Sequence, residues 1–432
     1  MTLRNNRRQH AVGQGFFHSG ALMEGGELRL RYVYDCGAMQ KYAAERDARI
    51  DDYLARVGAR SPLHILYISH VHADHLNGVS RLLDAKTGLK VDTIVLPLIN
   101  VADRLIGFAR TATEDAGSAA DAFYRDFIIN PAAALSRFNP RQILFIEAGP
   151  RDGGAPGSDG APADDFPRRD LIGKGAPETR PAWELVGQGS IRWEDGPAGT
   201  AAPVRTMVIP DTMAMMTAAN QSEWLLAPFV DPTVSSHTSK FLNALAKRRK
   251  MSRAKLAAWL RITANVQILV TTDLGDLVGA YSDIAKDLNV ASLCLYSGPA
   301  PSAQSLPRRA FAQFGGVTLR SGERDHQPIA WLATGDAALK EKARRTDFLN
   351  HYGALLENVL TLTLPHHGSD HNFDPELLDR VRPNLCLAAA DRFSKWKHPG
   401  PHAIQSVASR GLFLQVVTSQ TPSTAWESVQ VG

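Results

Sequence analysis

The sequence predicts an α/β protein made of two αβ halves with helical insertions. Short apolar runs of strand character alternate with helical segments in both halves of the chain. Histidine and aspartate residues directly follow several of these runs, the earliest near residue 70 and the latest near residue 398. If these residues share one site, the core of this 432-residue chain has to close around both of its ends.

The expected elements follow from apolar periodicity and from the turn residues that bound each run. A helix is expected over 38–57, with Arg, Glu and Asp on its outer face. The expected strands cover 28–35, 63–69, 91–98, 143–147, 183–193, 204–209 and 224–229.

Three segments are interpreted as insertions. Residues 101–138 are Ala-rich with helical spacing, which predicts either a packing helix pair or a lid over the site. Residues 149–181 are rich in Gly, Pro, Asp and Arg with few aliphatic side chains, which predicts a mobile loop that adds nothing to the core. Residues 231–288 are expected to form a helical, basic insertion.

The most informative stretch is Ser69-His70-Val71-His72-Ala73-Asp74-His75, which directly follows the apolar run Ile65–Ile68. Three imidazoles and a carboxylate on a loop at the end of a buried strand are typical of a metal site. His70 and His72 can converge on one ion while Asp74 and His75 face a second. A chance cluster of surface histidines is the alternative, but a solvated loop gives no physical reason for so many histidines within a few residues.

Other landmarks follow in order along the chain. Asp35 ends the apolar run Tyr32–Tyr34, and Asp336 follows the run Trp331–Ala333. The rest are Val12-Gly13-Gln14-Gly15, Pro365-His366-His367-Gly368-Ser369 and His398-Pro399.

Together these motifs resemble the metallo-β-lactamase fold, and their combination is most similar to the hydrolase domain of DNA-internalisation competence proteins. The resemblance spans residues 12–399 and implies one domain over 1–432, built as a four-layer αββα sandwich. Phe16 and Phe17 stand where that pattern usually has Asp, which leaves His18 as the next polar group. No counterpart of the family's third-motif histidine is evident, since His237 and His326 each stand alone.

The resemblance implies a dinuclear metal centre, with Zn²⁺ as the first expectation and Mn²⁺ as the second. Asp336 would bridge the ions, a hydroxide between them would attack the substrate, and Asp74 would orient or deprotonate that water. Adjacent imidazoles at a strand end should point apart, so one of His366 and His367 is expected to serve catalysis while the other packs. The implied metal ligands are His70, His72, Asp74, His75, Asp336 and His398.

Supporting roles are expected for four further residues. Asp35 and His18 would hold the metal loop. Gly368 and Ser369 either offer a backbone N–H and a hydroxyl to a phosphate oxygen or form a structural turn.

A basic segment, Lys247-Arg248-Arg249-Lys250, lies inside a helical run expected over 240–263. It would follow the phosphates of DNA or RNA, or it is a solvated helix face. The net charge of +4 permits nucleic acid without demanding it.

The function expected is metal-dependent hydrolysis of a phosphodiester, most simply by a nuclease. One alternative is a cyclic-nucleotide, ester, thioester or lactone hydrolase. Another is a nucleic-acid-binding or partner-regulated module with low turnover. Three isolated cysteines, no apolar leader and no apolar run of membrane length predict a cytoplasmic protein without a membrane partner.

Overall fold

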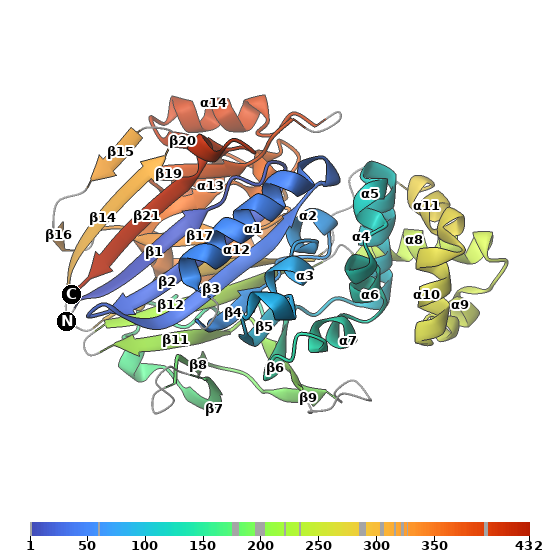
Figure 1. The fold of residues 1–432 in the computed structure, drawn as a ribbon, viewed down its shortest axis with the longest axis horizontal. Coiled ribbons are helices and arrows are strands. Elements are labelled where there is room, and N and C mark those ends of the chain that lie inside the picture. The colour runs from blue at the N-terminus through green and yellow to red at the C-terminus, as the bar shows by residue number, and fades with distance from the viewer. Residues whose placement is uncertain are drawn as a thin grey trace.

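The computed structural model shows a mixed α/β protein with two large β-sheets (Figure 1). It describes residues 2–58, 61–174, 181–194, 204–219, 222–232, 235–284, 291–302, 306–314, 317–320, 324–325, 327–392 and 396–432. Among these residues, no helix combines the length and the apolar composition that a membrane crossing requires.

The first sheet contains both ends of the chain. Its first and last strands in sequence pair antiparallel, with Leu3 opposite Val431, and Figure 1 shows the two termini side by side. The short strand β16 (Arg324–Asp325) pairs only with β14. In spatial order the other strands are β15 (Val317–Arg320), β14 (Pro307–Phe314), β21 (Ala425–Val431), β1 (Leu3–Gln9), β2 (Gly15–Glu24), β3 (Glu27–Ala38), β4 (Leu63–Tyr67), β5 (Val91–Pro97), β6 (Gln142–Glu147), β10 (Arg205–Pro210) and β9 (Arg192–Glu194).

The strands of the second sheet come from the part of the chain between residues 168 and 417. The strands at one end of it run parallel, and the others pair antiparallel. In spatial order they are β20 (Phe413–Val417), β19 (Leu385–Ala389), β18 (Val359–Thr363), β17 (Ala330–Ala333), β13 (Ser292–Pro299), β12 (Ser222–Asp231), β11 (Met213–Ala219), β8 (Trp183–Gly187) and β7 (Arg168–Gly173).

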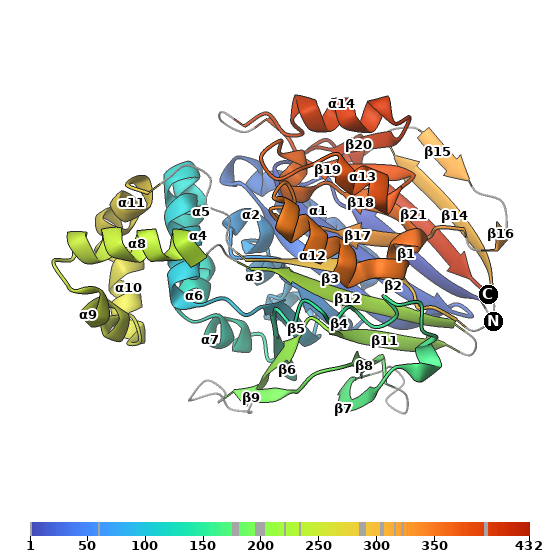
Figure 2. The ribbon, with the colours of Figure 1, turned by 180° about the vertical axis from the view of Figure 1, so that it is seen from behind.

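Helices cover the outer faces of the sheets, and some extend beyond them (Figures 1 and 2). The α-helices are α1 (Ala43–Val57), α2 (Ala73–Leu76), α3 (Val79–Leu82), α4 (Val101–Glu114), α5 (Ala116–Ala119), α6 (Ala122–Ile129), α7 (Pro131–Ser136), α8 (Ser235–Arg248), α9 (Arg253–Trp259), α10 (Thr263–Thr271), α11 (Leu274–Ser282), α12 (Lys342–Tyr352), α13 (Glu376–Val381) and α14 (Pro401–Ser409). Short 3-10 helices cover Gln40–Tyr42, Ala85–Thr87, Ala163–Asp165, Gly353–Asn358, Pro365–Gly368 and Thr421–Ser423.

Three buried apolar clusters hold these layers together. The cluster between the sheets includes Tyr67 from the first sheet and Trp331 from the second. A second cluster joins the outer face of the first sheet to α1, α4 and α6, and a third joins the outer face of the second sheet to α12, α13 and α14. Each large apolar side chain buried in this way contributes about 1.5–3 kcal/mol.

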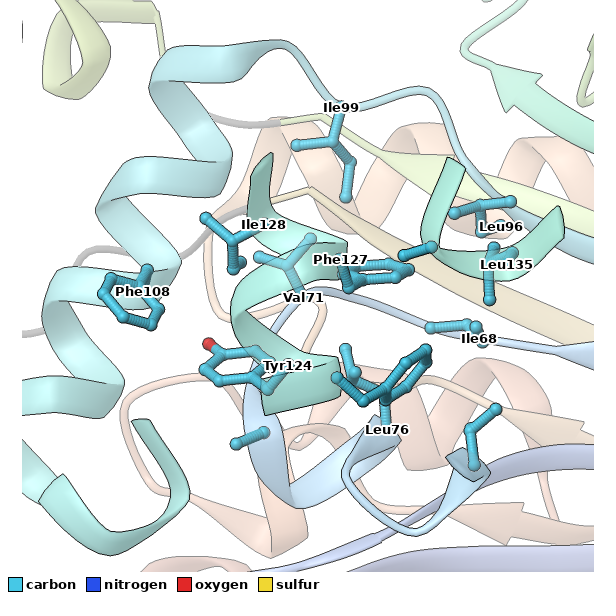
Figure 3. Packing of buried hydrophobic residues seen from close by; sticks show 14 of the residues in the cluster. Ile68, Val71, Leu76, Leu96, Ile99, Phe108, Tyr124, Phe127, Ile128 and Leu135 are labelled. Carbon is cyan, nitrogen blue, oxygen red and sulfur yellow. The ribbon is translucent and has the colours of Figure 1, made fainter. Parts of the chain in front are cut away.

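The helices predicted over 101–138 form α4 to α7 and pack on the histidine loop. Figure 3 shows Val71 of that loop against Phe127 and Ile128 of α6. Gly107 of α4 lies so close that a Cβ placed there would stand 2.5 Å from Cγ2 of Val71. The packing role predicted for this segment is therefore present in the structure.

The basic insertion forms a separate layer of helices, α8 to α11, on the side of α4 and α6 that faces away from the sheets (Figures 1 and 2). The single helical run expected over 240–263 is wrong. Helix α8 ends at Arg248, Lys250 adopts a left-handed conformation with φ of 52°, and Ser252 caps the N-terminus of α9.

The prediction that 149–181 adds nothing to the core is also wrong for its described part. Arg168–Gly173 forms strand β7 at the edge of the second sheet, and Ala155, Ala163 and Phe166 are buried in the outer cluster of that sheet. The small side chains of this segment pack closely enough to bury the ring of Phe166. Residues 175–180 of this segment lie outside the described residues.

Candidate metal centre

The candidate ligands lie on loops that follow parallel strands. Asp35 is near the end of β3, His70 follows β4, Asp336 follows β17, and His366 follows β18. The strands β3 and β4 are parallel neighbours in the first sheet, and β17 and β18 are parallel neighbours in the second, so each pair brings its carboxyl ends together at one edge of its sheet. The contacts of Asp336 with His70 and His75 join these two edges.

Asp35 organises the histidine loop. One carboxylate oxygen, Oδ1, accepts a hydrogen bond from the backbone N–H of Ser69 at 2.6 Å. The other, Oδ2, accepts from the Ser69 hydroxyl at 2.6 Å and lies 2.7 Å from Nδ1 of His75. Asp35 has φ of 58°, a conformation disfavoured for side chains with a Cβ, and these three contacts compensate for it.

Asp336 lies at the centre of the imidazoles, as the sequence predicts. Its Oδ2 is 3.2 Å from Nε2 of His70 and 3.7 Å from Nδ1 of His72, and its Oδ1 is 3.6 Å from Nε2 of His75. Its backbone N–H donates to the hydroxyl of Ser292 at 3.0 Å, which fixes the loop after β17.

Both adjacent histidines face the cluster, and the prediction that one of them packs elsewhere is wrong. His366 Nε2 is 3.4 Å from Oδ2 of Asp336, and His367 Nε2 is 3.3 Å from Oδ2 of Asp74. The physical reason is a left-handed backbone at both residues, with φ of 50° and 58°. This conformation turns consecutive side chains toward the same side, at a cost of about 1–2 kcal/mol per residue.

The hydrogen bonds behind four imidazoles select their tautomers. Asn372 donates from Nδ2 to the carbonyl of Asp336, so its Oδ1 accepts from Nδ1 of His366 at 2.9 Å. Nδ1 of His367 donates to the carbonyl of Ala389 at 2.7 Å. Each Nδ1 therefore carries the proton, and each Nε2 presents a lone pair to the cluster.

In His70 and His75 of the loop, Nδ1 likewise faces an acceptor behind the ring, and His75 presents a lone pair on Nε2 once it is neutral. Because the Ser69 hydroxyl donates to Asp35, it accepts from Nδ1 of His70 at 2.9 Å. The carboxylate of Asp35 accepts from Nδ1 of His75. This outer layer of acceptors is the arrangement that orients histidine ligands in metalloproteins.

Side-chain ligand atoms lie within 4.8 Å of one another in three overlapping groups: His70, His72 and Asp74; His70, His75 and Asp336; and Asp74, His75 and His367. Among the described residues, Nε2 of His70, Nε2 of His72 and Oδ1 of Asp336 are buried without a hydrogen-bond partner. Buried polar atoms without partners are costly unless another group satisfies them. The donor set of neutral imidazoles and carboxylates fits a divalent metal ion.

Charge interactions in the metal-free cluster are strong. Burial lowers the pKa of His72 to about 3, with a further contribution from Arg110. Burial acts in the same direction on His75, but Asp35 and Asp74 outweigh it and raise the pKa of His75 to about 9. Burial opposes ionisation of Asp74, yet His75 keeps the pKa of that carboxyl well below its usual range. Asp74 is therefore a carboxylate at neutral pH.

His398 is in none of the three ligand groups, and its predicted role as the terminal ligand stays a prediction. Its ring centroid is 5.6 Å from that of His366 and 6.4 Å from that of His367. His367 stands beside Asp74 and His75, because both residues of the His-His pair turn inward. Burial, followed by the nearby His367, lowers the pKa of His398 to about 4.

The supporting role expected of His18 belongs to a different residue. His18 stacks on Trp331 at 3.8 Å between the sheets, whereas the ring that stacks on His75, at 6.0 Å, is that of Phe16. Alternation along β2 explains this, because His18 and Phe16 share one face of the strand and only Phe16 is level with the metal loop.

The Gly368-Ser369 pair fits the turn alternative. Gly368 has φ of 83°, and a Cβ there would stand 2.7 Å from Cβ of Pro399. The Ser369 hydroxyl accepts from the backbone N–H of His371 at 3.2 Å. Of the two residues considered for the third-motif histidine, His237 lies on α8 outside the ligand groups, and His326 lies outside the described residues.

The basic segment is partly neutralised inside its own insertion. Arg248 pairs with Asp283 at 2.9 Å, and Arg249 pairs with both Asp273 and Asp276. Lys247, Arg248 and Lys250 are exposed, and Arg249 is partly buried. Acidic residues of α11 and of the turns before and after it offset the charge of the two arginines, and phosphate binding by this segment stays a prediction.

Sequence reasoning missed Arg110 of α4, a buried cation beside the cluster. Its Nη2 is 3.3 Å from Nε2 of His366, and its Nε donates to Glu114 at 3.0 Å. The available signal was an arginine directly after the apolar stretch Ile106–Ala109, because a charged residue on an apolar helix face is rarely buried without a partner.

A small cavity of about 10 Å³ lies against the cluster, which is space for about one water molecule. Its lining residues include His72, Asp74, Arg110, Asp336 and Trp396. A much larger hollow of about 1070 Å³, lined by residues of 147–167, 187–190 and 210–212, shares none of them.

Comparison with known proteins gives no assignment. A scan against models of protein families finds no match, and a search of curated proteins finds none. The interpretation of the site therefore depends on its geometry and on the chemistry of its residues.

Proposed function

We propose that this protein is a metal-dependent hydrolase that cleaves a phosphodiester. One observation carries the proposal: four imidazoles and two carboxylates from loops far apart in sequence form overlapping ligand groups, His366 joins them through Asp336, and Nε2 of His70, Nε2 of His72 and Oδ1 of Asp336 are buried without a hydrogen-bond partner. A purely structural cluster would bury these atoms at a cost that no hydrogen bond repays.

The proposed fold is the four-layer αββα sandwich of the metallo-β-lactamase type, in one domain with helical insertions. Three apolar clusters in the order helix–sheet, sheet–sheet and sheet–helix support it. The position of the ligand loops at strand ends supports it as well. The narrower likeness to the hydrolase domain of DNA-internalisation competence proteins remains a proposal that depends on the sequence motifs.

We propose two divalent ions, with Zn²⁺ preferred over Mn²⁺ because imidazoles outnumber carboxylates. His70, His72 and His366 would hold one ion, Asp74, His75 and His367 the other, and Asp336 would serve both. Such ions supply Lewis acidity, which polarises a phosphoryl oxygen and brings the pKa of water close to neutrality.

The residues of the chain would position the reacting groups. Asp74 is a carboxylate at neutral pH, lines the cavity and is suited to orient or deprotonate the attacking water. Asp35, Ser69 and Asn372 hold the imidazole rings through their outer nitrogens. Substrate would enter beside α4, where the small cavity lies.

DNA or RNA is the first substrate class to test. A small phosphodiester such as a cyclic nucleotide is the second candidate, supported by the ion pairs that occupy Arg248 and Arg249 of the basic segment. Ester, thioester and lactone hydrolysis, and a binding module with low turnover, are further outcomes of the same test.

The experiment combines metal analysis of the purified protein with hydrolysis assays. The substrates are bis-p-nitrophenyl phosphate, plasmid DNA, single-stranded DNA, RNA and a set of cyclic nucleotides, each with and without a chelator. Asp336→Asn should lose bound metal and hydrolysis together. His64→Gln removes a buried imidazole that accepts from the backbone N–H of Arg31 outside the cluster and serves as the matched control.

The expected result is bound divalent metal and chelator-sensitive cleavage of at least one phosphodiester, absent in Asp336→Asn and present in His64→Gln. A wild-type protein that binds no divalent metal would refute the proposal. Bound metal with cleavage of neutral esters alone would replace the phosphodiesterase by another hydrolase.

A further inference from the structure

Arg110 is a buried guanidinium with incomplete pairing. The residue is 3% exposed on α4, and its Nε donates a hydrogen bond to Glu114. Among the described residues, its Nη1 is buried without a hydrogen-bond partner. A buried N–H of a charged group is satisfied by a ligand or by water in most proteins.

Arg110 belongs to the wall of the small cavity beside the cluster. The residue lines that cavity together with Asp74, Asp336 and His366. The ring of Trp396 lies 5.7 Å from the guanidinium carbon, which fixes the plane of the group. A planar cation held in this way is preorganised for an oxygen pair of matching spacing.

Metal binding would release a second N–H of the same group. His366 carries its proton on Nδ1, because Asn372 accepts there, so Nε2 has one lone pair. That lone pair faces Nη2 of Arg110 at 3.3 Å and Oδ2 of Asp336 at 3.4 Å. It can serve a metal or accept from Arg110, but not both.

We propose that Arg110 binds the non-bridging oxygens of a tetrahedral phosphoryl group next to the metal centre, and that the protein thereby selects anionic phosphoesters over neutral esters. This inference rests on the proposed function in placing the reacting phosphorus at the His-Asp cluster. Nη1 and Nη2 form the fork that matches two phosphate oxygens, while Glu114 holds Nε from behind.

The surroundings of Arg110 include features that a purely structural ion pair with Glu114 does not require. A surface Arg–Glu pair at i and i+4 needs neither a stacked tryptophan nor contact with a ligand histidine. A neutral ester offers no charge to the guanidinium before reaction, whereas a phosphodiester brings one. Arg110 therefore discriminates between the two classes at the binding step.

The test uses full-length protein loaded with Zn²⁺ and freed of excess metal. Binding of inorganic phosphate is measured by calorimetry, and metal content is measured on the same samples. Arg110→Gln removes the charge, and Arg110→Lys keeps the charge without the fork. Arg104→Gln is the control on the same helix, because Arg104 donates to the backbone carbonyls of Ile99, Ile128 and Ile129.

We expect Arg110→Gln to weaken phosphate binding about 10- to 100-fold with metal content unchanged. The phosphate affinity of Arg110→Lys should lie between those of Arg110→Gln and the wild type. Arg104→Gln should bind phosphate as tightly as the wild type. In hydrolysis assays, Arg110→Gln should raise KM for bis-p-nitrophenyl phosphate, and the fold increase should exceed any fold loss in the rate of p-nitrophenyl acetate hydrolysis.

Three results would overturn the inference: equal phosphate affinity in Arg110→Gln and the wild type, loss of metal together with phosphate affinity, or no phosphate binding by the wild type. If Arg110→Gln does not fold, Arg110→Lys with wild-type affinity for phosphate would overturn it as well. Phosphate binding that depends on Arg110 in a protein without phosphodiesterase activity would refute the proposed function and leave the anion site in place.

Discussion

Oδ2 of Asp35 lies 2.7 Å from Nδ1 of His75, and this contact ties the end of one strand to a ligand forty residues later. The same carboxylate orients His70 through the Ser69 hydroxyl. One buried acid therefore fixes two imidazoles with their Nε2 atoms directed at Asp336. The dependence of metal binding on pH should reflect this pair.

The first prediction concerns protons released on metal binding. In the metal-free protein His75 is protonated below a pKa of about 9, and a ligand imidazole must be neutral. Metal affinity should therefore rise with pH up to about 9, and binding at neutral pH should displace about one proton from His75. Calorimetry in buffers of different ionisation enthalpy counts these protons.

Asp35→Asn provides the comparison, because it removes the strongest of the charges that raise the pKa of His75. Its proton release at neutral pH should fall below that of the wild type. Metal affinity should also decrease by about 10- to 100-fold, since an outer partner of a ligand is lost. Identical proton counts in both proteins would show that His75 is not a ligand.

The second prediction concerns Asp74. Asp74→Ala should lower turnover about 100-fold or more on any substrate that the wild type cleaves, while the fold and one bound metal remain. The Asp74 carboxylate lies 3.3 Å from Nε2 of His367, and the ligand group of His70, His75 and Asp336 does not include Asp74 and stays intact. Metal content, circular dichroism and steady-state rates measure the three effects. Unchanged hydrolysis would exclude the proposed role of Asp74.

The third prediction concerns the contact between α4 and the histidine loop. Gly107→Ala places a methyl group 2.5 Å from Cγ2 of Val71 and 3.5 Å from Cδ2 of His72. We expect a loss of about 1–3 kcal/mol in stability and weaker metal binding, because the loop must move.

Gly275→Ala is the matched control, since a Cβ there meets nothing within 4 Å. It should be neutral or slightly stabilising, because Ala is the better helix former in α11. Thermal unfolding and metal titration compare the two variants. A harmless Gly107→Ala would mean that α4 does not support the loop.

The fourth prediction separates the lysines of the basic segment from its arginines. If a polymer binds there, Lys247→Gln with Lys250→Gln should flatten the dependence of DNA or RNA affinity on salt by up to about two in logarithmic slope. Hydrolysis of bis-p-nitrophenyl phosphate should not change, because that substrate reaches only the cluster.

Arg248→Gln with Arg249→Gln should instead reduce stability by less than about 1 kcal/mol per ion pair, since these pairs are partly exposed. Salt-dependent binding assays and thermal unfolding distinguish the two pairs of substitutions. An unchanged salt dependence after loss of both lysines would make the segment a solvated surface.

The sequence alone determined the features that depend on spacing within one segment. His70, His72, Asp74 and His75 lie on one tight loop after a strand, so their chemistry can be read without knowing the rest of the chain. The apolar pattern of residues 28–35 likewise predicted the strand that carries Asp35.

Tertiary structure decided which way side chains point and what stands behind them. Both His366 and His367 face the cluster because their backbone is left-handed, which no residue pattern announces. Arg110 becomes part of the site only because α4 packs on the histidine loop at Gly107. Ring direction and long-range proximity depend on backbone angles and packing between distant segments, and those are properties of the folded chain rather than of local sequence.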